Sequence, residues 1–288
     1  MKRIYYTIIF VALHSISFGQ KLPEIQKQSQ LAPIAIKIDG KLSEWNDNFL
    51  AENKRTEIFY TIANDNKNLY LVLKSTSSTN TTKIFAGGVT FVVNTHGKKS
   101  DKDAQSITYP IIKRAERGQQ GIRQGQFGQG GFQNRTQQTP RQRDSINLVQ
   151  RKTQLADIKE LKIAGFKLIT DSLISIYNEY GIKAVGSIDS KGEYVYEMAI
   201  PLRLLDLSTE TPKEFSYQIK VNGLSNIGFG GQGRMAVGER GAGGNFGGAG
   251  MGGGGRGAGG TFQGGGQSGM TELGNSTDFW GKYLIIKN

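Results

Sequence analysis

The sequence predicts an all-β protein, an antiparallel β-sandwich with two long low-complexity loop insertions. Two observations predict this fold class: short segments of alternating or continuous apolar residues recur along the chain, and turn-forming residues separate most of them. A third is the scarcity of helical periodicity, which is convincing only at 153–160, with one further turn at 202–207. Many short strands with few helices are typical of a sandwich of two sheets.

The expected strands follow one another in a regular order. The first alternating segment is 33–39. A hairpin comes next, because 56–63 places Ile58, Tyr60 and Ile62 on one face and the turn residues NDNK follow it. The remaining strands are expected at 68–75, 87–94, 160–166, 172–178, 193–201, 214–222 and 279–287, with one more before the DSKG turn at 189–192.

Two low-complexity segments interrupt this pattern. Residues 113–143 are rich in Gln, Gly and Arg, and residues 223–270 contain 23 of the 40 glycines. Glycine loses the most backbone entropy on ordering, and neither segment has enough apolar surface to offset that cost. We therefore expect two flexible insertions in a single β-sandwich domain spanning 20–288. Much of the net charge of +12 belongs to them, because 113–143 alone holds seven basic residues and one Glu.

The first nineteen residues have the three parts of a secretory signal peptide: a basic start at Lys2 and Arg3, a mostly apolar stretch, and small residues Ser17 and Gly19 at a cleavage site. A membrane anchor is the alternative, but a spanning helix needs about 20 apolar residues. We expect 1–19 to be cleaved and the protein to be exported, to a periplasmic, outer-membrane-associated or extracellular location. The absence of Cys excludes disulfides and thiolate metal sites, and it favours a bacterial exported protein. No later segment is apolar enough to span a bilayer.

Four stretches together resemble the family 9 carbohydrate-binding module and its wider DOMON-like relatives. They are IDGKLSEW at 38–45, IANDNKNLYLVL at 62–73, YVYEMAIPLRLL at 194–205 and FWGKYLII at 279–286. The resemblance implies a β-sandwich and carbohydrate as the ligand class. It also implies that Phe85 occupies one of the family's two aromatic sugar-stacking positions and that Trp280 lies in the core. The second stacking position falls at 274–276, where this chain has Gly, Asn and Ser.

Four residues are candidates for ligand contact: Phe85, Trp45, Asp39 and Glu44. An aromatic ring can stack on a sugar, and carboxylates accept hydrogen bonds from its hydroxyls or ligate a cation. The alternatives stay open, with Trp45 as a core residue that caps one end of the sandwich, and Asp39 and Glu44 as turn residues. No metal or cofactor is expected. Asp65 belongs to a hairpin turn, with Ca²⁺ ligation as its alternative.

The sequence contains no recognisable catalytic motif. His96 is the one His left after cleavage and lies in a hydrophilic loop, and neither GxSxG nor HExxH occurs. We therefore expect a non-catalytic exported binding module, with carbohydrate as its ligand class and polysaccharide or envelope components as partners. The alternative is a structural or assembly protein of the cell envelope that uses glycine-rich loops for contacts. An enzyme ranks third. Nucleic acid is not expected as a partner, although Arg/Gly segments with Phe do bind single strands.

Overall fold

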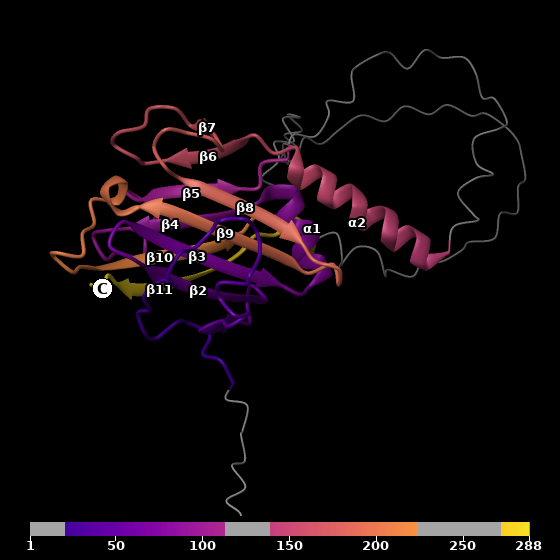
Figure 1. Ribbon diagram of the computed structural model, residues 1–288, viewed down its shortest axis with the longest axis horizontal. Helices are drawn as coiled ribbons and strands as arrows, with labels where there is room; N and C mark the ends of the chain where they lie inside the picture. The colour runs from indigo at the N-terminus through magenta and orange to yellow at the C-terminus, as the bar shows by residue number, and fades with distance from the viewer. Residues whose placement is uncertain (1–20, 113–138, 224–271, 288) are drawn as a thin grey trace, which may run out of the picture.

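The computed structural model describes residues 21–112, 139–223 and 272–287, which form two antiparallel sheets stacked face to face (Figure 1). One sheet has the strand order β1-β2-β3-β9-β8 and the other β11-β10-β4-β5-β6-β7. The predicted all-β sandwich is confirmed. Its elements are β1 (Ala51–Asn53), β2 (Ile58–Asn64), β3 (Asn68–Ser75), α1 (Ser78–Gly87), β4 (Val89–Asn94), β5 (Gln105–Tyr109), α2 (Pro140–Ala156), β6 (Glu160–Ala164), β7 (Leu173–Ser175), β8 (Lys183–Ile188), β9 (Tyr194–Pro201), the 3-10 turn η1 (Leu202–Leu205), β10 (Glu214–Val221) and β11 (Thr277–Leu284).

Alternation along each strand decides which side chains fill the space between the sheets. On β2 the residues that turn inward are Ile58, Tyr60 and Ile62, and all three are fully buried. Burying one such apolar side chain stabilises the fold by about 1.5–3 kcal/mol. The hydroxyl of Tyr60 lies 2.9 Å from that of Tyr217 on the opposite sheet. A hydrogen bond therefore joins the two sheets inside one continuous apolar core.

The two expected strand pairs are confirmed: β2 and β3 form a hairpin, and β8 and β9 pair across the turn at 189–192. The structure also pairs β10 with β11 along its length. Asp65 closes the hairpin turn, because its Oδ1 accepts the backbone N–H groups of Lys67 and Asn68. The buried rings of β11 are Phe279 and Tyr283. Trp280, for which the resemblance implies a core position, is only partly buried and lies on the other face of the strand.

The strand expected at 33–39 is wrong. The segment belongs to an irregular N-terminal coil (indigo in Figure 1) that lies against the outer face of the five-stranded sheet. Ala35 has φ of 61°, a left-handed value that interrupts an extended strand. Ile36 and Ile38 pack on a second apolar cluster formed by residues of β2, β3 and β9. Two of the three alternating isoleucines therefore contact a sheet face without pairing of the backbone, whereas the third, Ile34, is exposed.

The helix expected at 153–160 lies further towards the N-terminus. α2 covers Pro140–Ala156, and β6 already begins at Glu160. The start is set by a capping box: Thr139 Oγ1 accepts the N–H of Gln142 at 3.3 Å, and the Gln142 side chain accepts the N–H of Thr139 at 2.9 Å. The last four residues of the expected insertion at 113–143 are therefore helical.

The helix α1 has no counterpart among the expected elements. Ser77 caps its start by accepting the N–H of Asn80, and Gly88 ends it with φ of 75°, a value that suits glycine. Arg151 of α2 donates to Thr82 of α1 at 3.1 Å. The two helices are therefore joined at one end of the sandwich, from which α2 extends outward (Figure 1).

Several expectations lie outside the described residues. They are the signal peptide at 1–19 and nearly all of the insertions at 113–143 and 223–270. Of the second insertion the structure describes only Gly223, which lies beside the chain just after that insertion, because a side chain on Gly223 would collide with the backbone of Gly274 and Asn275. Within 21–112, 139–223 and 272–287, no helix combines the length and the apolar character needed to cross a membrane.

Candidate functional site

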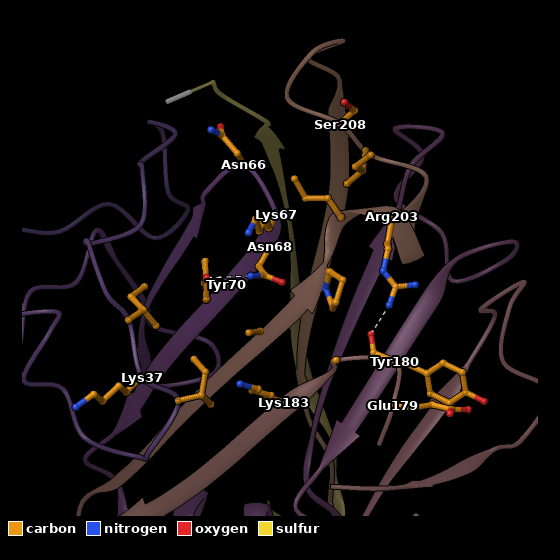
Figure 2. Close-up of a pocket in the computed structure, with 17 residues that line it drawn as sticks. Lys37, Asn66, Lys67, Asn68, Tyr70, Glu179, Tyr180, Lys183, Arg203 and Ser208 are labelled. Carbon is orange, nitrogen blue, oxygen red and sulfur yellow. Dashed lines mark hydrogen bonds between the residues drawn. The ribbon is translucent and has the colours of Figure 1, made fainter. Parts of the chain in front are cut away.

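A pocket of about 950 Å³ opens on the outer face of the five-stranded sheet, beside the β2–β3 hairpin (Figure 2). Its floor follows from the strand register. Tyr70 of β3, Ala199 of β9 and Lys183 of β8 lie side by side across three strands. Asn68 and Pro201 form the next row. Successive residues of a strand point to opposite faces, so these five side chains turn outward while their neighbours fill the core. The floor is therefore built on paired, rigid backbone.

Segments distant in the sequence supply the walls. Ile36 and Ile38 come from the N-terminal coil and form an apolar side. Asn66 comes from the hairpin turn, and Arg203 and Ser208 come from η1 and the loop after it. The lining therefore mixes apolar side chains with hydrogen-bonding groups around one opening.

Four cations border this pocket: Lys37, Lys67, Lys183 and Arg203. Among the described lining residues the one acidic side chain is Glu179. None of the four cations has a carboxylate within 4.0 Å in the described parts of the chain, whereas lysines elsewhere do form such pairs. The border therefore carries a positive charge that the described chain does not neutralise by direct pairing.

The backbone holds the guanidinium of Arg203 in place. Its Nη2 donates to the carbonyl oxygen of Tyr180 at 2.8 Å (Figure 2). A guanidinium has five N–H donors in one plane. This is its one hydrogen bond within residues 21–112, 139–223 and 272–287. The other N–H donors are therefore available to a ligand. The hydrogen bond to Tyr180 already restricts the position of the guanidinium.

The ring of Tyr70 links the floor to the hairpin turn. Its hydroxyl donates to Oδ2 of Asp65 at 2.7 Å and accepts from the side-chain amide of Asn68 at 3.2 Å. Burial and the Asp65 carboxylate raise the pKa of Tyr70 to about 12. The phenol is therefore neutral near neutral pH and adds no negative charge to the pocket.

Trp45 is buried, with 4% of its surface exposed. It packs edge-to-face on Tyr70, with ring centroids 6.5 Å apart, in the cluster on the outer face of the five-stranded sheet. Its Nε1 donates to Oε1 of Glu197 at 3.0 Å. The packed interpretation of Trp45 fits this burial, but the ring covers a sheet face and does not cap an end of the sandwich.

Glu197 holds the N-terminal coil against β9. Its Oε2 accepts the backbone N–H groups of Asp39 at 3.0 Å and Gly40 at 2.7 Å, and its Oε1 accepts from Trp45. Burial raises the pKa of Glu197 above its ordinary value, although the three N–H donors act in the opposite direction. The sequence did not single out this residue, because only the fold shows that it faces the IDGKLSEW motif.

Asp39 and Glu44 lie at the surface of the same coil. Oδ1 of Asp39 accepts the N–H of Lys41 at 2.9 Å, as in a turn, and Asp39 borders a second pocket of about 650 Å³. Glu44 accepts a hydrogen bond from the hydroxyl of Ser43 at 2.7 Å, which lowers the pKa of Glu44. Neither carboxylate lines the pocket of Figure 2.

Phe85 lies on α1, half-buried against the core. Its ring meets Tyr194 edge-to-face with centroids 6.2 Å apart, and the guanidinium of Arg151 lies 5.5 Å from its centroid. Tyr194 faces the inside of the sandwich, whereas Trp45 packs on the outer face of the same sheet. The structure therefore does not bring Phe85 together with the other three candidate residues.

The described residues gather no metal ligands. In those ranges no group of three or more His, Asp or Glu side chains could hold an ion. The carboxylate of Asp65 accepts two backbone N–H groups and the Tyr70 hydroxyl, which is the role of a turn residue. His96 is exposed in the loop after β4.

The four cations of the pocket were not among the residues selected from the sequence. They come from the coil, the hairpin turn, β8 and η1, and only the folding of these segments onto one sheet face brings them together. Lys67 and Arg203 do lie within two of the four family 9-like stretches. That position is the one sequence signal by which they could have been found.

Comparison with known proteins assigns neither a family nor a function to this chain. No protein-family model, no curated protein and no solved structure matches the chain.

Proposed function

We propose that this chain is an exported, non-catalytic binding module that holds a carbohydrate in the pocket bordered by Tyr70, Lys183 and Arg203. The observation that carries the proposal is the mixed lining of that pocket, in which apolar and hydrogen-bonding side chains surround one cavity of about 950 Å³. Sites for small ligands commonly have volumes of about 300–1,000 Å³ and combine apolar walls with a few polar groups.

This lining suits the chemistry of a sugar, whose ring has apolar C–H faces and a rim of hydroxyls. Ile36, Ile38 and Pro201 offer apolar contact to such a face. Asn68 and Arg203 offer hydrogen-bond donors to the hydroxyls. The resemblance of four stretches to family 9 carbohydrate-binding modules supports the same ligand class, and the signal-peptide pattern at 1–19 supports export.

Oligosaccharide binding by the purified protein tests this function, with a glycan array followed by calorimetric titration of the glycans that bind. Asn68→Ala should weaken binding by about fivefold, because it removes one hydrogen bond worth about 1 kcal/mol. The control is Gln218→Ala, which removes an amide from the outer face of the other sheet and should leave the affinity unchanged. Failure to bind any glycan would overturn the proposal, and equal affinity of the two variants would place the ligand elsewhere.

An assembly role in the cell envelope is the alternative. It relies on glycine-rich contacts by 223–270, nearly all of which lie outside the described residues. Fractionation of the protein into an insoluble envelope complex, without sugar binding, would favour this alternative.

A further inference from the structure

The charge around the pocket restricts which carbohydrate can bind there. Lys37, Lys67, Lys183 and Arg203 border it, and Glu179 is the one described acidic residue in its lining. We infer that the ligand is an acidic carbohydrate, a chain of sugars that carries carboxylate or sulfate groups. This inference rests on the proposed function and deepens it by naming the class of sugar.

The positions of the cations suit an extended anionic chain. Figure 2 shows Arg203 on one side of the pocket, Lys67 and Lys183 nearer its middle, and Lys37 on the opposite side with its ammonium group pointing away from the other labelled residues. A single small anion can contact only part of such a border. An oligosaccharide with a charged group on successive sugars places several anions along it, so more than one cation gains a partner.

Electrostatics favours such a ligand over a neutral one. The four cations have no carboxylate within 4.0 Å in the described chain, and Lys37 interacts at longer range with Glu44. A pocket lined by one sign of charge concentrates ligands of the opposite sign. A neutral sugar would offer these cations no opposite charge, whereas an acidic one would supply anions with which they can pair.

Arg203 gives the site its most directional contact. Its guanidinium is restricted by the bond to the Tyr180 carbonyl and retains free N–H groups within the described chain. The planar fork of Arg matches the two oxygens of a carboxylate or the oxygens of a sulfate, whereas Lys acts as a flexible point charge. Arg203 therefore orients an acidic group, and the lysines add attraction that depends weakly on geometry.

Three probes distinguish recognition of the charged groups from recognition of the sugar ring. They are an oligogalacturonate, the same oligosaccharide with its carboxylates methyl-esterified, and a sulfated chondroitin oligosaccharide. The oligogalacturonate or the sulfated probe should bind at least about tenfold more tightly than the ester, since several surface ion pairs of up to about 1 kcal/mol each are at stake. Whichever acidic probe binds more tightly identifies carboxylate or sulfate as the preferred group. Added salt should weaken that binding, because exposed charges are screened.

Pocket variants separate this site from general attraction to a basic protein. Lys183→Gln and Arg203→Gln should each weaken binding of the acidic probe by about threefold, and the double variant by about tenfold. The matched control is Lys191→Gln, an exposed lysine in the β8–β9 turn, which removes the same charge and should leave the affinity unchanged. Thermal unfolding of each variant confirms that it remains folded.

The outcomes distinguish the two proposals. If neither acidic probe binds more tightly than the ester, the acidic-sugar inference is overturned and carbohydrate binding is left standing. Acidic binding that Lys183→Gln and Arg203→Gln weaken no more than Lys191→Gln would overturn this pocket as its site. Absence of binding to all three probes and to the glycan array would overturn both.

Discussion

Glu197 shows how one buried side chain can fix the position of a whole segment. Its carboxylate is 1% exposed and accepts N–H groups from Asp39, Gly40 and Trp45. Two of the family 9-like stretches are thereby joined, because the acceptor lies in YVYEMAIPLRLL and the donors lie in IDGKLSEW. Without this acceptor, three N–H groups beside an apolar cluster would lose a partner, which costs about 1–3 kcal/mol for each one left unsatisfied.

We predict that the wild-type protein loses stability relative to Glu197→Gln as the pH rises from about 4 to about 7. Burial raises the pKa of Glu197, so the folded protein binds this proton more tightly than the unfolded chain does. The stabilisation that this tighter proton binding provides is fully present below the pKa of Glu197 in the unfolded chain, about 4.3. It is lost as the pH rises through the higher pKa of Glu197 in the folded protein. Gln does not titrate, so the difference in the free energy of unfolding isolates the effect.

Urea unfolding of the two proteins at several pH values measures this difference. Glu210→Gln, at an exposed carboxylate that pairs with Lys287, is the control and should not show the same trend. A difference that moves in favour of the wild type with rising pH would mean that the three N–H donors outweigh burial.

Between neighbouring strands, glycines make room for tyrosine rings. Gly281 of β11 lies opposite Tyr217 of β10, and a side chain there would collide with that ring. In the other sheet, a side chain on Gly186 of β8 would lie 2.5 Å from the hydroxyl of Tyr194 on β9. Each sheet thus packs a buried tyrosine over a glycine of the adjacent strand. Tyr217 in turn reaches Tyr60, so the glycine of β11 supports the bond between the sheets.

Gly281→Ala should lower the free energy of unfolding by about 1–3 kcal/mol, the usual cost of adding atoms to a packed core. The added methyl group must displace the ring of Tyr217 and so disturb its hydrogen bond to Tyr60. Gly274→Ala is the matched control, because its methyl group would meet open space. Chemical denaturation measures both variants. Equal stability of the two would show that the ring moves aside without cost.

For the molecule as a whole, the second insertion is expected to be dispensable for folding. Gly223 and Gly274 adjoin, so a short turn can join β10 to β11. We predict that a Gly/Ser linker of about six residues in place of 224–271 raises stability by up to about 2 kcal/mol, since each halving of a loop saves about 0.6 kcal/mol of closure entropy. Thermal unfolding measures the change. A variant with 224–271 scrambled should melt like the wild type, and a cooperative loss of β-sheet signal in the shortened chain would show that the segment packs.

The sequence predicted those parts of the molecule that depend on neighbours in the chain. The hairpin of β2 and β3 follows from local alternation and a turn at Asp65. The local alternation wrongly predicted a strand at 33–39, because a coil that covers a sheet face can alternate in the same way as a strand. It also failed for the pocket, whose floor depends on the register of β3, β9 and β8 and so on contacts between segments far apart in the chain.

The position of β11 suggests that the fold does not require an unbroken chain between β10 and β11. Among the described strands β11 lies at the edge of its sheet and pairs only with β10, and it buries Phe279 and Tyr283 in the core. A proteolytic cut within 224–271 would therefore divide the polypeptide while leaving every described strand pair intact. The nicked protein would migrate as two fragments under denaturing conditions and as one particle under native ones. For the same reason, a chain that lacks β11 should bind a separate peptide with the sequence of this strand.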